Sequence, residues 1–174
     1  MQSRVLLLVP VGNPPPGLLK EVEEPLRAHL AITCQHADKP LASPAYAFNK
    51  DRQQYHANAI MRRISPLLGP GQRFAMGVAD VDLFVPDSPF VFGETDREAR
   101  VAVVSVFRLK GADAETVRRR VQVEALHQAG HLLGLSYCED PRCVMFLAQS
   151  PEDVDHKGMS VCNLCRNELH KLSA

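Results

Sequence analysis

The spacing of apolar and polar positions divides the first two-thirds of the chain into short strands and helices. The apolar run VLLLV at residues 5–9 predicts a buried strand that ends at Pro10, and residues 30–35 predict a second strand. Between these strands a GNPPP turn leads into a helix over residues 18–29. Residues 39–47 are rich in Pro, Ala and Ser, and they predict a loop.

The same alternation continues through the middle of the chain. Asp51 is expected to cap a helix that runs to Ile64. Residues 73–85 predict one or two strands, and a PDSP turn separates them from a short strand over residues 90–92. Residues 101–107 carry the strongest strand pattern in the chain. Strands that alternate with helices predict an α/β fold, in which a mixed twisted sheet packs on two or three helices.

The final third of the chain has a different pattern. A long helix is expected over residues 113–133, followed by little regular structure until a last helix over residues 163–172. A chain of 174 residues favours one compact domain over two full ones. We therefore expect a single domain, with a sheet and the long helix in residues 1–134 and a smaller C-terminal subdomain in residues 135–174.

Charge excludes one class of partner. Lys and Arg total 20, as do Asp and Glu, and no long run carries one sign, so a nucleic-acid partner held by a basic face is not expected. The apolar stretch at residues 5–9 is too short for a signal-peptide core or a membrane span. We expect a cytoplasmic monomer with no membrane partner.

Four of the five cysteines are clustered near the C-terminus, while Cys34 stands alone. An odd number of cysteines argues against a disulfide framework, and in a reducing cytoplasm clustered thiols are more often metal ligands. Two close pairs separated by a loop are typical of a tetrahedral thiolate site for structural zinc, which leaves no position for water. The expected ligands are Cys138, Cys143, Cys162 and Cys165. The alternative, four buried free thiols, is disfavoured by the paired spacing.

The segment HQAGH places His127 and His131 four residues apart, so on a helix both imidazoles lie on one face and can bind one metal ion. The spacing alone supports ordinary buried or surface histidines equally well. Gly134 can end the helix in a left-handed conformation, which allows the chain to turn Tyr137 back towards the same ion.

The segment HQAGHLLGLSYC, followed by the cysteine pairs, resembles the archaemetzincins, a family of metzincin zinc peptidases with four cysteines that bind a second zinc. The resemblance covers residues 73–174 well and the first 70 residues loosely. It implies a metzincin-like fold, an active-site helix and a Met-turn at Met145, together with peptide substrates. It also implies that the structural zinc fixes the floor of the active site.

Two positions depart from the family pattern. Gln128 replaces the Glu that serves as the family's general base, and Tyr137 replaces the family's third histidine ligand. An amide holds a water molecule but cannot accept its proton, and loss of general-base help slows a reaction on the order of a hundred- to ten-thousand-fold. Tyr137 either binds zinc as a phenolate or only packs beside it. His156 is an alternative third ligand, and Glu124, one turn before His127, is an alternative base that otherwise has a supporting or surface role.

Three functions follow. The first is an archaemetzincin-like zinc peptidase of weak or lost activity, with its substrate extended along residues 90–92 as a cleft edge strand. The second is an inactive, zinc-stabilised protein that binds a peptide or a partner. The third, a four-cysteine nucleic-acid module, is disfavoured by the neutral charge.

Overall fold

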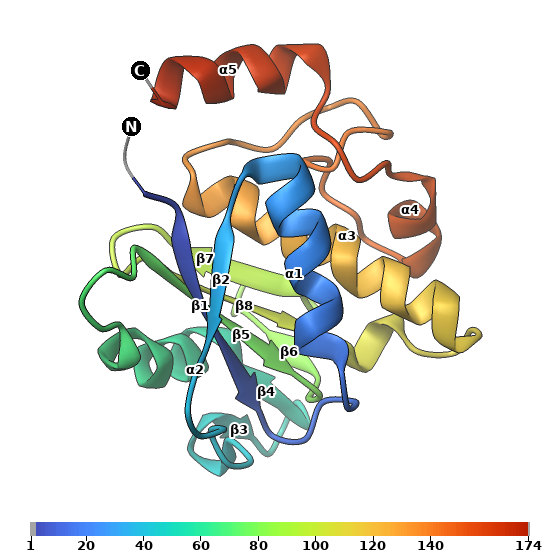
Figure 1. The fold of residues 1–174 in the computed structure, drawn as a ribbon. Helices are drawn as coiled ribbons and strands as arrows, with labels where there is room; N and C mark the ends of the chain where they lie inside the picture. The colour runs from blue at the N-terminus through green and yellow to red at the C-terminus, as the bar shows by residue number, and fades with distance from the viewer. Residues whose placement is uncertain (1–2, 174) are drawn as a thin grey trace.

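A twisted five-stranded sheet forms the centre of the molecule, for which a computed structural model describes residues 3–173 (Figure 1). The strand order is β2-β1-β5-β8-β7, and every neighbouring pair is parallel except β7 with β8. The strands are β1 (Val5–Val11), β2 (Thr33–His36), β5 (Phe74–Ala79), β7 (Gly93–Asp96) and β8 (Val101–Ser105). The mixed α/β fold expected from the alternating pattern is therefore confirmed.

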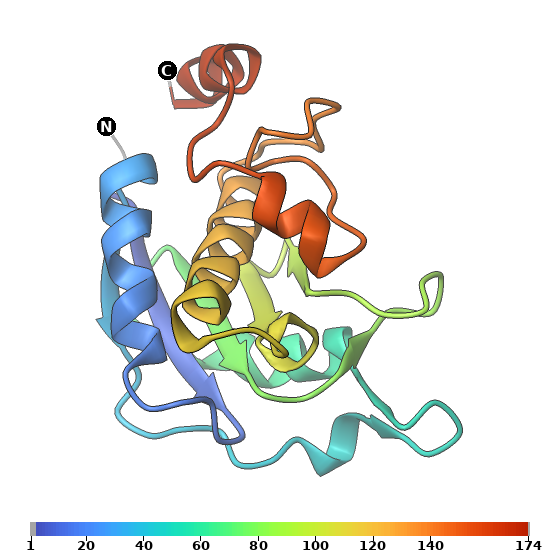
Figure 2. The same cartoon turned by 90° about the vertical axis from the view of Figure 1, so that its right-hand side faces the viewer.

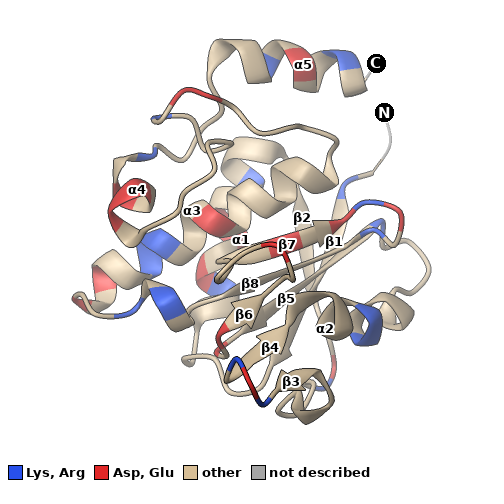
Figure 3. Cartoon of the chain, turned by 180° about the vertical axis from the view of Figure 1, so that it is seen from behind, with Lys and Arg blue, Asp and Glu red and all other residues tan. Residues whose placement is uncertain are grey.

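Alternate residues of the sheet face two different helical layers. Leu6 and Leu8 of β1 pack with α1 (Leu18–Leu30) and α3 (Ala114–Leu132), whereas the intervening Leu7 packs with α2 (Ala57–Ile64). Helices α1 and α3 thus cover the face seen in Figure 1, and α2 covers the face seen from behind in Figure 3. A continuous apolar run in β1 is the consequence of burial on both faces.

A second sheet of three very short strands lies beside α2. Its order is β3-β4-β6, and the strands are β3 (Phe48–Asn49), β4 (Gln54–His56) and β6 (Leu83–Phe84). The prediction that Asp51 caps a helix is wrong, because Asp51 lies in the turn between β3 and β4 and α2 begins only at Ala57. The side chain of Asn49 closes this turn by accepting a 3.0 Å hydrogen bond from the backbone N–H of Arg52.

Three strand predictions also need correction. Strand β1 does not end at Pro10 but continues to Val11. The carbonyl of Pro10 accepts from the N–H of Leu41, beyond the end of β2. Because Pro10 faces this side, its missing N–H removes no hydrogen bond from the sheet. Residues 90–92 do not form the edge strand: Val91 makes one isolated bridge to Leu83, and the edge of the main sheet is β7. The strand predicted at residues 101–107 ends at Ser105.

The C-terminal part packs on the side and end of α3 (Figure 2). It contains α4 (Pro151–His156), which the sequence pattern did not predict, and α5 (Asn163–Ser173). The hydroxyl of Ser150 caps α4 by accepting from the N–H of Asp153 at 3.1 Å, and Arg120 of α3 pairs with Asp155 through two bonds of 2.7 and 2.8 Å. Within residues 3–173, no helix is long and apolar enough to span a membrane. The described part of the chain also has three 3-10 turns, at Ala45–Ala47, Ser65–Leu67 and Phe107–Leu109.

Gly77 in the central strand β5 allows α2 to pack closely on the sheet. A methyl group at Gly77 would lie 2.5 Å from Cδ1 of Ile64, whereas one at Gly69 in a loop would lie 3.6 Å from its nearest neighbour. We expect Gly77→Ala to lower the free energy of unfolding by about 1–3 kcal/mol through overpacking. Gly69→Ala is the control, and urea denaturation should show little loss for it; equal losses in both variants would contradict the packing argument.

Candidate metal centres

The two histidines lie in the last turn and a half of α3. Asp113 caps this helix by accepting from the N–H of Thr116 at 2.9 Å, and Gly134, with a φ of 106°, ends it. The N–H of Gly134 bonds to the carbonyl of His131 and that of Leu135 to the carbonyl of Gly130. The chain therefore reverses directly after the helix and returns past the histidines.

The imidazoles of His127 and His131 face each other with their Nε2 atoms 3.1 Å apart. Nδ1 of His127 donates to the carbonyl of Val144 at 2.8 Å, and Nδ1 of His131 donates to the carbonyl of Leu135 at 2.9 Å. Because a carbonyl can only accept, both protons reside on Nδ1 and both Nε2 lone pairs are free. Two nitrogens bound to one tetrahedral zinc lie roughly 3.3 Å apart, so the pair fits the ion.

Burial keeps both imidazoles neutral. It lowers the pKa of His127 to about 3, with the nearby Lys157 ammonium as a second cause, and it lowers the pKa of His131 to about 4. Metal binding at near-neutral pH therefore displaces no proton from either ring.

Gln128 lies between the two histidines and against the edge strand. Its Oε1 accepts a 2.7 Å hydrogen bond from the hydroxyl of Thr95 in β7, and its side chain is so close to Gly93 that a methyl there would lie 2.8 Å from its Nε2. The amide is 5% exposed and fixed. The pattern of residues did not predict the role of Thr95, because its partner lies 33 positions along the chain.

Tyr137 packs beside both imidazoles and is 58% exposed. Its ring centroid is 4.6 Å from that of His131 and 5.7 Å from that of His127. Burial and the Glu94 carboxylate raise the pKa of its phenol. His156 lies at the exposed end of α4.

Met145 forms the floor under the histidine helix. It is fully buried, and a methyl group at Gly130 would lie 2.3 Å from its sulfur. The backbone N–H of Cys138 donates to the carbonyl of Met145 at 3.0 Å, which holds the chain after Tyr137 against this floor.

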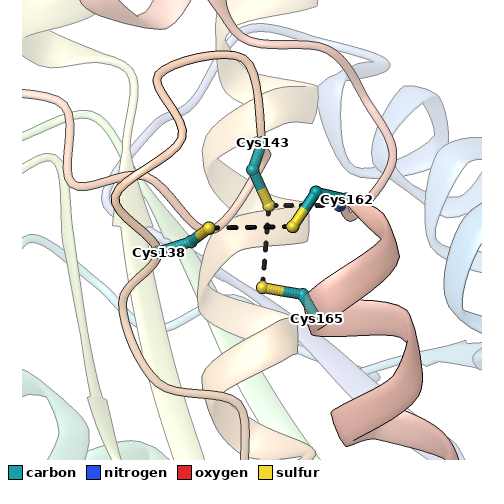
Figure 4. A group of neighbouring side chains, drawn as sticks. All are labelled: Cys138, Cys143, Cys162 and Cys165. Atoms are coloured by element: carbon teal, nitrogen blue, oxygen red, sulfur yellow. Dashed lines mark hydrogen bonds between the residues drawn. The ribbon is translucent and has the colours of Figure 1, made fainter.

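The four clustered cysteines converge on one point (Figure 4). All four sulfurs lie within 4.8 Å of one another, with Cys138 and Cys162 at 3.7 Å and Cys143 and Cys165 at 3.8 Å. Four sulfurs around one tetrahedral zinc lie roughly 3.8 Å apart, so the cluster has the dimensions of a thiolate site. Sγ of Cys143 also accepts from the backbone N–H groups of Met145 and Cys162 at 3.4 and 3.3 Å, as metal-bound thiolates commonly do.

A cleft runs across the histidine pair below β7. A cavity of about 750 Å³ reaches His131 and a second of about 350 Å³ reaches His127, and both are lined by Glu94 and Tyr137. The smaller cavity also has the aromatic wall of Phe90 and Phe92. Residues 90–92, expected as an edge strand, thus line the cleft without forming that strand.

A buried ion pair lies behind His127. Nζ of Lys157 is 3.0 Å from Oε1 of Glu124, and the two side chains are 0% and 3% exposed. Burial raises the pKa of Glu124 and the Lys157 charge lowers it, with burial the larger cause. The spacing of Glu124 predicts its place on this helix face, whereas nothing in the pattern around Lys157 indicates that its side chain is buried.

A mixed α/β domain with two buried histidines on one helix face beside a cleft is the arrangement expected of a zinc metallopeptidase. Peptidase family M54 matches residues 41–171, and the chain belongs to this family, the archaemetzincins. The archaemetzincin of Archaeoglobus fulgidus is 39% identical over 70% of this chain and 72% of its own length. That of Aeropyrum pernix is 34% identical over 96% of this chain and 93% of its own.

Solved archaemetzincins share the whole fold. The crystal structure from Methanopyrus kandleri superposes with a TM-score of 0.86 at 31% identity, covering 99% of this chain and 96% of that one. The Archaeoglobus fulgidus structure, complexed with malonate, has a TM-score of 0.82 at 31% identity and covers 94% of this chain and 99% of that one. The family resemblance inferred from HQAGHLLGLSYC and the cysteine pairs is therefore confirmed.

The imidazole environment gives a direct test in solution. After a weak chelator has removed any ion from the histidine pair, we expect ¹⁵N spectra to show the Nδ1–H tautomer for both His127 and His131, unchanged from pH 7 to pH 5. Their lowered pKa values, about 3 and about 4, account for this. In urea both should titrate near the ordinary value of about 6.5. Protonation of either ring above pH 5 in the folded protein would contradict the buried geometry.

Proposed function

We propose that this archaemetzincin holds one structural zinc at Cys138, Cys143, Cys162 and Cys165 and a second ion at His127 and His131, and that it hydrolyses peptide bonds weakly or not at all. The structural zinc is supported by sulfur separations that match a tetrahedral ion. The second ion is supported by the two free Nε2 lone pairs of His127 and His131, which lie 3.1 Å apart. Tyr137 is the position for a third protein contact.

Zinc at the histidine pair would supply a Lewis acid that polarises a carbonyl and acidifies a water molecule. The remaining chemistry depends on this chain's own groups. Gln128 can hold a water by a hydrogen bond, but its amide cannot take a proton at any ordinary pH. The amide oxygen of Gln128 already accepts a hydrogen bond from Thr95. The NH₂ group at the other end of the amide can only donate hydrogen bonds.

The observation that best supports weak activity is the fixed amide of Gln128, which stands at the position of the family's general-base Glu. A general base must accept a proton, and Gln128, which lines the same cavity as His127, carries an amide that cannot do so. Glu124 does not replace it freely, because Lys157 already occupies one of its carboxylate oxygens. The proposed activity is therefore weak, while the cleft remains suited to bind an extended peptide.

Peptide binding without cleavage is favoured by a separate observation. Strand β7 is the last in the main sheet, so its outer edge carries backbone groups that no other strand of that sheet satisfies. The cleft below it extends on both sides of the histidine pair. A peptide added to this edge would cross the site by β-augmentation.

We also propose that residues 135–174 act as a zinc-stapled subdomain attached to residues 1–134, and that the protein works as a cytoplasmic monomer. Hydrogen bonds that join Cys138, Cys143 and Cys162 to the Met145 segment support the first part. None of the five cysteines forms a disulfide, which supports a reducing compartment.

Metal content tests the two centres separately. We expect two zinc ions per chain in the wild-type protein and one in His127→Ala/His131→Ala, measured by elemental analysis. Cys143→Ser should lose the thiolate-bound ion and melt at a much lower temperature, because a structural zinc contributes folding free energy. Cys34→Ser is the matched control and should keep both ions. One ion in the wild type that survives the double histidine substitution would rule out the second centre.

Restoring the missing groups tests the catalytic part. Gln128→Glu can still accept from Thr95 and adds a base, so we expect Gln128→Glu/Tyr137→His to cleave an unstructured protein such as casein about 10²–10⁴-fold faster than the wild type. Gln35→Glu adds the same charge on the exposed strand β2, outside the cleft, keeps an oxygen acceptor for Gln72, and should not change the rate. A restored variant that binds two zincs but stays inert would place the defect elsewhere in the cleft.

A further inference from the structure

We propose that the buried Lys157–Glu124 pair is a positioning device, which holds the imidazole of His127 and the segment beneath it in the arrangement that binds metal. Its metal-binding consequence rests on the proposed ion at the histidine pair. The orientation of His127 does not require an ion, and it can be measured separately.

Burial of this pair is costly and calls for a reason. Both side chains are almost fully removed from water, at 0% for Lys157 and 3% for Glu124. Desolvation of two charges often exceeds their mutual attraction, and well-packed apolar residues frequently replace such pairs without loss of stability. A contribution to folding alone therefore does not explain why the helix face next to His127 contains a carboxylate and an ammonium.

The contacts of Lys157 explain the arrangement geometrically. Its Nζ donates to Oε1 of Glu124 at 3.0 Å and to the carbonyl of Phe146 at 2.8 Å, and it lies 3.4 Å from Nδ1 of His127. Val144, two residues before Phe146, provides the carbonyl that accepts from the same Nδ1 at 2.8 Å. One ammonium thus connects the helix to the segment whose carbonyl sets the tautomer of His127.

The backbone at Lys157 is itself fixed. Its N–H donates to Val154 at 3.1 Å, and its carbonyl accepts from Nη2 of Arg119 at 2.5 Å. Figure 3 shows the basic stretch of α3 beside acidic α4, where Arg119 makes this bond and Arg120 pairs separately with Asp155. The ammonium is therefore delivered to His127 from a rigid support.

Charge matters as well as position. The Lys157 ammonium lies 3.4 Å from Nδ1 of His127, and without a partner its charge would oppose the binding of a cation at Nε2 of the same ring. The Glu124 carboxylate offsets this positive charge. The pair gives an oriented, electrically balanced support for a ligand that is itself neutral. Outer contacts of this kind typically change metal affinity by about 10–100-fold when they are removed.

The experiment compares two ion pairs that join the same two parts of the chain. Glu124→Met/Lys157→Met removes the pair next to His127, and Arg120→Met/Asp155→Met removes a pair that has no contact with it. Each protein keeps its thiolate-bound zinc, and three quantities are measured: urea stability, ¹⁵N tautomer spectra of His127, and affinity for added Co²⁺ from its absorption bands. Lys157→Gln provides a smaller change if the first double variant does not fold.

We expect Glu124→Met/Lys157→Met to keep near wild-type stability, to lose the single Nδ1–H tautomer of His127, and to bind Co²⁺ about 10–100-fold more weakly. The Arg120→Met/Asp155→Met control should keep the tautomer and the affinity, whatever its stability. Glu124→Gln, which retains an oxygen acceptor for Lys157, should keep the tautomer.

A Glu124→Met/Lys157→Met variant with the wild-type tautomer would overturn the proposal, and so would equal effects in both double variants. If the wild type takes up no Co²⁺ beyond its thiolate site, the proposed ion at the histidine pair fails, and the tautomer comparison alone decides the role of the Lys157–Glu124 pair.

Discussion

Two hydrogen bonds from imidazole nitrogens to backbone carbonyls determine what the histidine helix can do. They place both protons on Nδ1, so the two Nε2 lone pairs point at one another at 3.1 Å. Two lone pairs at that separation repel unless a cation lies between them. Each acceptor belongs to a different segment after the helix, Leu135 in the turn at its end and Val144 beside the cysteine cluster. The site therefore exists only when the C-terminal part is folded against α3.

This dependence explains why the cysteine cluster lies where it does. Cys143 precedes Val144 directly, and Cys138 follows Tyr137, so the chain between the two centres is short and bonded at both ends. Fixing the sulfurs fixes the carbonyl that orients His127 and the methionine floor beneath Gly130. A mobile segment at this point would allow the imidazoles to adopt other tautomers.

The parts of the site that depend on local spacing were predictable from the sequence. Histidines four apart on a helix share a face, and two cysteine pairs carry their ligand spacing within themselves, so His127, His131 and the cysteine cluster needed no tertiary information. Lys157 and Thr95 lie 33 positions from Glu124 and Gln128, and no local pattern reports such contacts.

The errors in the predicted fold have the same origin. Asp51 has the composition of a helix cap, yet the pairing of β3 with β4 uses those residues for a turn. Strand β7 has the sequence GETD, with none of the apolar alternation that marks a buried strand, because it lies at the edge of the sheet. The apolar residues 90–92 before it resemble a strand and serve instead as cleft wall.

The acidic composition of β7 has a consequence for self-association. Glu94 and Asp96 are two residues apart, so both side chains lie on one face of the strand. If two copies of the protein joined their sheets edge to edge through β7, these carboxylates would be brought together across the new ladder, and like charges opposite one another are destabilising. Natural proteins protect exposed edges with charge in this way. The edge at which we propose that a peptide binds is thereby protected against pairing with other copies of the same chain.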